Sequence, residues 1–197
     1  MIPLGILGSA RVSSGATVLA SDNFNRADST TTLGTSSGGQ AWTARSGTWG
    51  INSNGGYVVT GSDVVATVDV GRSQDFTANI SMNSAPNWPG LVVRCADASN
   101  YYWVELGGGS GTQLSRRMAG ARTVLAETSN TRVAWQSVSV VVTDNGSGTR
   151  FVVTVDGVPR IDYTDSTAGR PAGNHVGMYA QPSSGVPAFD NFTVTAP

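Results

Sequence analysis

Lysine is absent from this chain of 197 residues, so all twelve cationic side chains are arginines. The formal net charge at pH 7 is −1, and the arginines do not gather into a basic stripe. This charge pattern argues against nucleic acid as a partner. Arginine suits bidentate contacts with carboxylates and phosphates, although a GC-rich coding genome would explain the same arginine-only composition.

Cysteine and long apolar runs are also scarce. The single cysteine, Cys95, lies in the apolar run 90–95 and cannot form a disulfide within the chain. We therefore predict that Cys95 is a small, buried side chain. No run reaches the roughly 20 apolar residues that cross a bilayer, so we expect no membrane partner.

In place of charge, the chain has glycine, serine, threonine and many short segments in which every second residue is apolar. This period of two recurs in segments 64–70, 76–82, 91–96, 101–106, 138–143, 151–156 and 175–179. Turn-forming sequences such as Asp156-Gly157 separate the segments, and no segment of eleven or more residues shows a helical period. The pattern predicts an all-β protein of antiparallel sheets with one face buried.

The alternating pattern begins near Ser21, and residues 1–20 have no clear period. We therefore predict an N-terminal arm and linker over 1–20 and one domain over 21–197. The first ten residues, MIPLGILGSA, lack a leading charged segment, so a signal peptide is weakly supported. A short extended arm that docks onto a partner explains them better, and its docking side chains would be Ile2, Leu4, Ile6 and Leu7.

Several short segments follow one another in an order typical of a single domain type. They are DNFNR at 22–26, GQAW at 39–42, GTWGI at 47–51, GLVVR at 90–94, NYYWVEL at 100–106, VTVDG at 153–157, GMY at 177–179 and FDNFTV at 189–194. In this order they resemble the concanavalin A-like (laminin-G-like) domains, over about residues 21–197. The resemblance implies a two-sheet antiparallel jelly-roll sandwich.

Glycoside hydrolases of this fold class carry carboxylates in a pattern such as E-x-D-x-x-E, which this chain lacks. Its only glutamates, Glu105 and Glu127, are far apart in sequence, whereas glycoside hydrolysis usually needs two carboxyl groups roughly 5 to 9.5 Å apart. The chain also lacks a nucleophile elbow, a phosphate-binding loop and zinc-ligand spacing. We therefore predict that the protein is not an enzyme.

The parity of the central strands predicts an outward face with a ligand site. If the apolar residues 91, 93 and 95 face the core, Arg94 points outward, and by the same reasoning so do Trp103, Glu105 and Tyr179. Exposed aromatic rings beside polar groups can stack on sugar rings and bind their hydroxyls. The alternative is that Trp103 lies under a loop while Arg94 and Glu105 form a cross-strand ion pair. Trp88, between prolines, is either a ligand-contacting loop tip or a lid on the core.

The resemblance also implies a structural calcium ion, because such domains often join their N- and C-terminal strands through one. Asp22 and Asp190 lie in those strands, and calcium prefers carboxylate and carbonyl oxygens. The alternative is that both aspartates cap turns or accept backbone hydrogen bonds. No other cofactor is expected.

The opening DNFNRADSTTTLGT and the short apolar arm resemble modules in minor tail proteins of bacteriophages that infect actinobacteria. This resemblance implies a non-enzymatic structural protein of the virion, a minor tail or surface component. Its partners would be other virion proteins or sister subunits, contacted through the arm, and host cell-wall glycan. The alternatives are a secreted bacterial carbohydrate-binding module and, less favoured, a glycan hydrolase.

Overall fold

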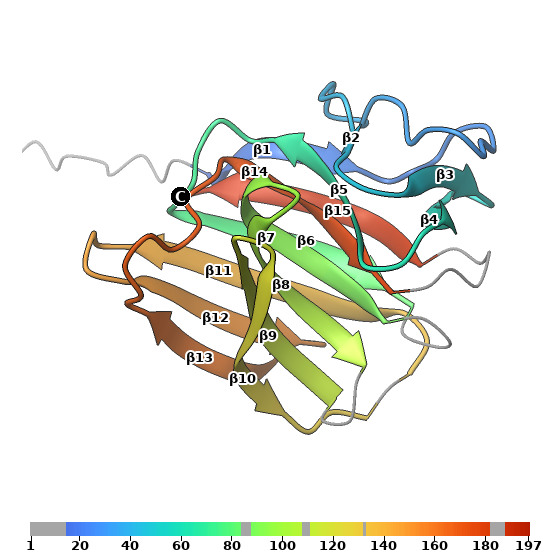
Figure 1. Ribbon diagram of the computed structural model, residues 1–197. Coiled ribbons are helices and arrows are strands. Elements are labelled where there is room, and N and C mark those ends of the chain that lie inside the picture. Colours follow the sequence, from blue (N-terminus) through green and yellow to red (C-terminus); the bar gives the residue numbers. More distant parts are fainter. Residues whose placement is uncertain (1–14, 84–87, 108–110, 132, 182–187) are drawn as a thin grey trace, which may run out of the picture.

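The computed structural model describes residues 15–83, 88–107, 111–131, 133–181 and 188–197 (Figure 1). These ranges contain strands and turns and no helix. Accordingly, no helix suited to crossing a membrane is found among them.

The strands are β1 (Thr17–Asp22), β2 (Thr43–Ala44), β3 (Thr48–Asn52), β4 (Gly55–Thr60), β5 (Val64–Asp69), β6 (Phe76–Met82), β7 (Pro89–Asp97), β8 (Asn100–Gly107), β9 (Gly111–Met118), β10 (Ala121–Thr128), β11 (Gln136–Asp144), β12 (Thr149–Val155), β13 (Val158–Asp165), β14 (His175–Ala180) and β15 (Phe189–Ala196).

The strands form two antiparallel sheets that pack face to face (Figure 1). The eight-stranded sheet has the order β13-β12-β11-β6-β15-β4-β3, with β1 also paired to β15. The seven-stranded sheet has the order β10-β9-β8-β7-β14-β5-β2. The predicted two-sheet sandwich is therefore confirmed. Strands far apart in the sequence, such as β7 and β14, become neighbours in it.

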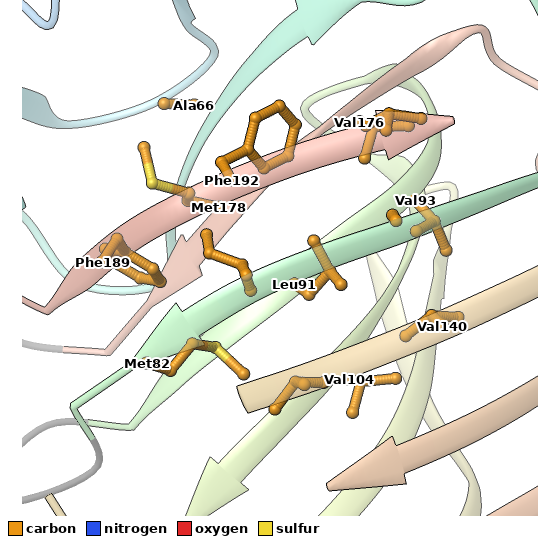
Figure 2. Packing of buried hydrophobic residues seen from close by; sticks show 14 of the residues in the cluster. Ala66, Met82, Leu91, Val93, Val104, Val140, Val176, Met178, Phe189 and Phe192 are labelled. Atoms are coloured by element: carbon orange, nitrogen blue, oxygen red, sulfur yellow. The ribbon is translucent and has the colours of Figure 1, made fainter. Parts of the chain in front are cut away.

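The hydrophobic core fills the space between the two sheets. Figure 2 shows Leu91 and Val104 of the seven-stranded sheet packed near Val140 of the other sheet. On β6 the alternation follows the prediction, because residues 76, 78, 80 and 82 are buried and the residues between them are half-buried. The strands β7 and β8 differ, because nearly all of their residues are buried on both faces.

The domain begins earlier than the predicted boundary at residue 20. Strand β1 starts at Thr17, which pairs with Ala196, and it continues along β15 to Asp22. A bulge between Val18 and Ala20 breaks the alternation, which explains why the sequence pattern did not reveal this strand. The predicted docking residues Ile2, Leu4, Ile6 and Leu7 lie outside the described residues.

Candidate functional site

One face of the seven-stranded sheet is turned away from the other sheet and carries a cluster of aromatic and charged side chains. Cross-strand pairing defines this outer face, because directly opposed residues in antiparallel strands lie on the same side. We use the name outer face for Val92 and Cys95 of β7, Tyr101, Trp103 and Glu105 of β8, Gln113, Ser115 and Arg117 of β9, Arg122 of β10 and Tyr179 of β14. Three of the predicted site residues thus share one face, as their parity indicated.

Three aromatic rings in tilted contact form the centre of the outer face. The Trp103 ring lies 5.3 Å from that of Tyr101 and 5.1 Å from that of Tyr179, measured between centroids. Gly90 makes this approach possible, because a Cβ there would lie 3.2 Å from Tyr179 Cδ1 and 3.3 Å from Trp103 Cδ1. All three rings are fully buried. The expectation that Trp103 and Tyr179 are exposed for stacking on sugars is therefore wrong.

Two arginines cover the Trp103 ring. The Arg122 guanidinium carbon lies 5.1 Å and that of Arg117 5.9 Å from the ring centroid, within the range of cation–π attraction. Glu105 accepts hydrogen bonds from Trp103 Nε1 at 2.9 Å and from Arg122 Nη2 at 3.0 Å. Glu105 is thus buried and paired with Arg122, and the predicted ion pair with Arg94 does not form.

Tyr179 links the three aromatic rings to polar groups at one end of the outer face. Its hydroxyl donates to Asp63 Oδ1 at 2.5 Å, and Gln181 Nε2 donates to the Tyr179 oxygen at 3.1 Å and to Asp63 Oδ1 at 3.2 Å. Burial and the Asp63 carboxylate raise the pKa of Tyr179, so its hydroxyl stays protonated and acts as the donor to Asp63. The Asp63 side chain and the Gln181 amide are only partly buried.

An exposed indole lies at the same end. Trp88 is 39% exposed, and its ring rests on Gly107, where a Cβ would lie 2.5 Å from Trp88 Cδ1. Gln181 N donates to the Trp88 carbonyl at 3.4 Å, which places the Trp88 backbone beside the residue that follows β14. Both predicted roles of Trp88, a ligand-contacting loop tip and a lid on the core, stay predictions.

Arg94 does not lie on the outer face. It has a positive φ of 53°, and the register of β7 shifts against both β8 and β14 around this residue. The bulge reverses the parity of the strand, so that Arg94 turns toward the other sheet and Cys95 joins the outer-face rings. Cys95 is buried as predicted, although on the face opposite to the expected one.

The Arg94 side chain joins the two sheets at one edge of the sandwich. It donates from Nε to the Pro171 carbonyl at 2.9 Å, and Nη1 lies 2.9 Å from Asp144 Oδ2 on β11. Asp144 also accepts from Arg170 at 3.1 Å and from Thr149 Oγ1 at 2.6 Å. The Arg94 and Asp144 side chains are 3% and 6% exposed, so this buried network holds the fold together and cannot reach a ligand.

The Asp22 carboxylate is fully engaged with donors from the protein. Arg26 donates to both of its oxygens, at 2.9 and 2.7 Å, and Trp42 Nε1 and Phe24 N donate at 2.7 and 2.9 Å. Asp190 accepts from Asn191 N at 2.7 Å. Each aspartate thus accepts one backbone hydrogen bond of the kind that the alternative describes, and the calcium ion stays a prediction. In the part of the chain that the structure describes, no cluster of three or more acidic, histidine or cysteine side chains could hold a metal ion.

Sequence reasoning missed several residues of this region. Arg122 belongs to β10, whose sequence does not alternate clearly, and Asp63 and Gln181 stand just outside strands. Their positions follow from the pairing of β9 with β10 and of β5 with β14. Chemically, the assembled surface offers an exposed indole, amide and carboxylate groups and arginine donors, which is a combination suited to binding.

Neither a protein-family model nor a curated protein sequence matches the chain. Solved structures do share its fold. A carbohydrate-binding module from Bacillus subtilis, CBM66, aligns with a TM-score of 0.63 at 21% identity, over 79% of this chain and 95% of that one. An alginate lyase, Aly36B, aligns with a TM-score of 0.53 at 11% identity, over 90% of this chain and 96% of that one.

The GH43 protein BlXynB from Bacillus licheniformis aligns with a TM-score of 0.52 at 14% identity, over 90% of this chain and only 38% of that one. At these identities the likeness shows the fold alone. The chain therefore has the β-sandwich fold that is found in carbohydrate-binding modules.

Proposed function

We propose that the protein binds carbohydrate without chemical turnover, through the end of the outer face that carries Trp88. The observation that carries this proposal is the exposed Trp88 indole at the same end of the outer face as the hydrogen-bonded group of Asp63, Gln181 and the Tyr179 hydroxyl. Trp88 also packs on Gly107, which holds the ring in place.

This combination suits a sugar because a pyranose has an apolar face and a rim of hydroxyls. An indole supplies a rigid apolar surface, while amide and carboxylate groups hydrogen-bond pairs of hydroxyls. The fold adds support, since one similar structure is a carbohydrate-binding module and another is a lyase that acts on alginate.

A binding role is favoured over hydrolysis by the state of the carboxylates. Glu105 accepts two hydrogen bonds and pairs with Arg122, and Asp63 accepts from Tyr179 and Gln181. Both carboxylates thus accept hydrogen bonds from the protein, whereas glycoside hydrolysis needs a carboxyl group that donates to the substrate. Incubation with the polysaccharides it binds should therefore release no new reducing ends or unsaturated sugars, and release would favour the hydrolase or lyase alternative.

Binding can be tested by native affinity gels that contain xylan, arabinan, mannan, galacturonan or bacterial cell-wall polysaccharide. Trp88→Ala should abolish the retardation that the wild type shows, whereas Trp88→Phe should keep most of it because the aromatic surface remains. Trp135→Ala is the matched control, since Trp135 is 46% exposed just before β11 of the other sheet. Equal loss in Trp88→Ala and Trp135→Ala, or no retardation by any glycan, would contradict the proposal.

The narrower role in a virion remains a proposal that rests on the resemblance of the opening residues. Under it, many copies on a particle would strengthen weak sugar binding through avidity. Its test is incorporation into particles after deletion of residues 1–14, which leaves β1 intact because that strand starts at Thr17. Incorporation of the shortened chain would contradict docking through Ile2, Leu4, Ile6 and Leu7. A secreted module outside any virion is the competing proposal for its location.

A further inference from the structure

Two arginines are directly opposed at the end of the outer face away from Trp88. Arg117 of β9 pairs in register with Arg122 of β10, and both guanidiniums lie over the Trp103 ring. Like charges placed directly opposite on neighbouring strands destabilise a sheet. A local arrangement that opposes stability often marks a functional site.

Only one of these two positive charges is offset by a nearby carboxylate. Glu105 pairs with Arg122 at 3.0 Å. Within the described ranges, Arg117 has no ion-pair or hydrogen-bond partner for its side chain, and its Nε is buried without an acceptor. A buried donor without an acceptor is costly unless a ligand supplies one.

A second unpaired donor lies beside Arg117. The Tyr101 hydroxyl is buried and, among the residues that the structure describes, has no hydrogen-bond partner. Tyr101 is opposite Arg117 in register, and the Arg117 guanidinium lies 5.6 Å from the centre of its ring. Burial raises the pKa of Tyr101 to about 12, so the hydroxyl remains protonated at neutral pH and can donate.

We infer that the outer face recognises glycans that carry carboxylate groups, with the carboxylate bound by the guanidinium groups of Arg117 and Arg122. The inference rests on the proposed carbohydrate-binding function and specifies its substrate class. A carboxylate supplies acceptor oxygens for the two guanidinium groups, and its planar shape matches the fork of a guanidinium. It also neutralises the excess positive charge over Trp103. A neutral sugar hydroxyl would satisfy the donors without balancing that charge.

The geometry also suits a chain that extends along β8. Tyr101 and Gly107 lie at opposite ends of the strand, and six residues of a strand span roughly 20 Å. A polysaccharide that stacks on Trp88 can therefore place a later sugar unit near Arg117. The indole then binds sugar of any charge, and the arginines select the acidic ones.

The test compares polygalacturonate with its methyl ester, which has the same sugars without the negative charge, by titration calorimetry at low ionic strength. The wild type should bind polygalacturonate at least tenfold more tightly, since a charge-assisted hydrogen bond is worth about that factor. Equal affinity for the two polymers would overturn the inference while leaving the proposed function intact. Binding of neither polymer, nor of any neutral glycan, would overturn both.

Substitutions of single arginines test which residue causes the preference for polygalacturonate over its methyl ester. Arg117→Gln should remove the preference for polygalacturonate over the methyl ester, whereas Arg117→Lys should restore part of the preference and its salt dependence. Arg150→Gln is the control, because Arg150 is 54% exposed on the eight-stranded sheet, where it pairs with Asp162. A preference that persists in Arg117→Gln would overturn the assignment. So would an Arg117-dependent preference for dextran sulfate over polygalacturonate, since the site would then select sulfate.

Discussion

Replacement of Asp144 by asparagine should measure what the buried network between the sheets contributes to stability. The two carboxylate oxygens of Asp144 form ion pairs with Arg94 and Arg170 and accept a hydrogen bond from Thr149 Oγ1. The Asp144 side chain is 6% exposed. Asparagine keeps the shape but places an amide group where one oxygen accepted those donors. The buried Arg94 then loses its charged partner, which is the situation in which breaking an ion pair is most costly.

The magnitude follows from the pKa of Asp144. Burial alone would raise this pKa, but hydrogen bonds from Thr149 and Gly146 and the Arg94 charge lower it from 3.8 to about 2. At roughly 1.4 kcal/mol per pH unit, the folded state gains about 2 kcal/mol from the ionised carboxylate. Because the pKa is lowered on folding, this stability is present above about pH 4 and is lost as the pH falls toward 2.

The assay is urea unfolding followed by tryptophan fluorescence at pH 7, 4 and 2. Asp144→Asn should unfold about 2 kcal/mol more easily than the wild type at pH 7, and the difference should shrink markedly by pH 2. The control is Asp162→Asn, because Asp162 is 58% exposed in a surface ion pair, so its midpoint should not move measurably. If both variants behave alike at pH 7, or if the Asp144→Asn deficit is unchanged at pH 2, the reasoning is refuted.

Three further outcomes are expected from single sites. Gly90→Val should lower the free energy of unfolding by about 1–3 kcal/mol, because its side chain would push apart the Trp103 and Tyr179 rings, and a thermal melt identical to wild type would contradict this. Burial raises the pKa of the Cys95 thiol to about 11, so the native protein should not react with Ellman's reagent at pH 8, and one thiol per chain should react after denaturation. The melting temperature should be the same in calcium and in chelator, because protein donors already bind Asp22, and a calcium stabilisation that Asp22→Asn removes would refute this.

The sequence by itself predicted the fold class and the buried side of many strands. On β6 and β11 the alternation of apolar and polar residues corresponds to the alternation of buried residues with half-buried or exposed ones. One side of each of these strands packs on the core, and the other side is turned toward solvent. The sequence pattern also placed Trp103, Glu105 and Tyr179 on one face. This prediction holds because β8 and β14 have no register shift at these three residues.

The tertiary structure decided what those residues touch. The bulge at Arg94 shifts the register of β7 against both β8 and β14, and it turns Arg94 into a network with Asp144 on the other sheet. The covering of Trp103 by Arg117 and Arg122 depends on the order of β8, β9 and β10 in the sheet. A period of two residues reports only which side of its own strand a residue occupies. Register, bulges and strand order arise from contacts between distant segments, and they determine which side chains meet to form a site.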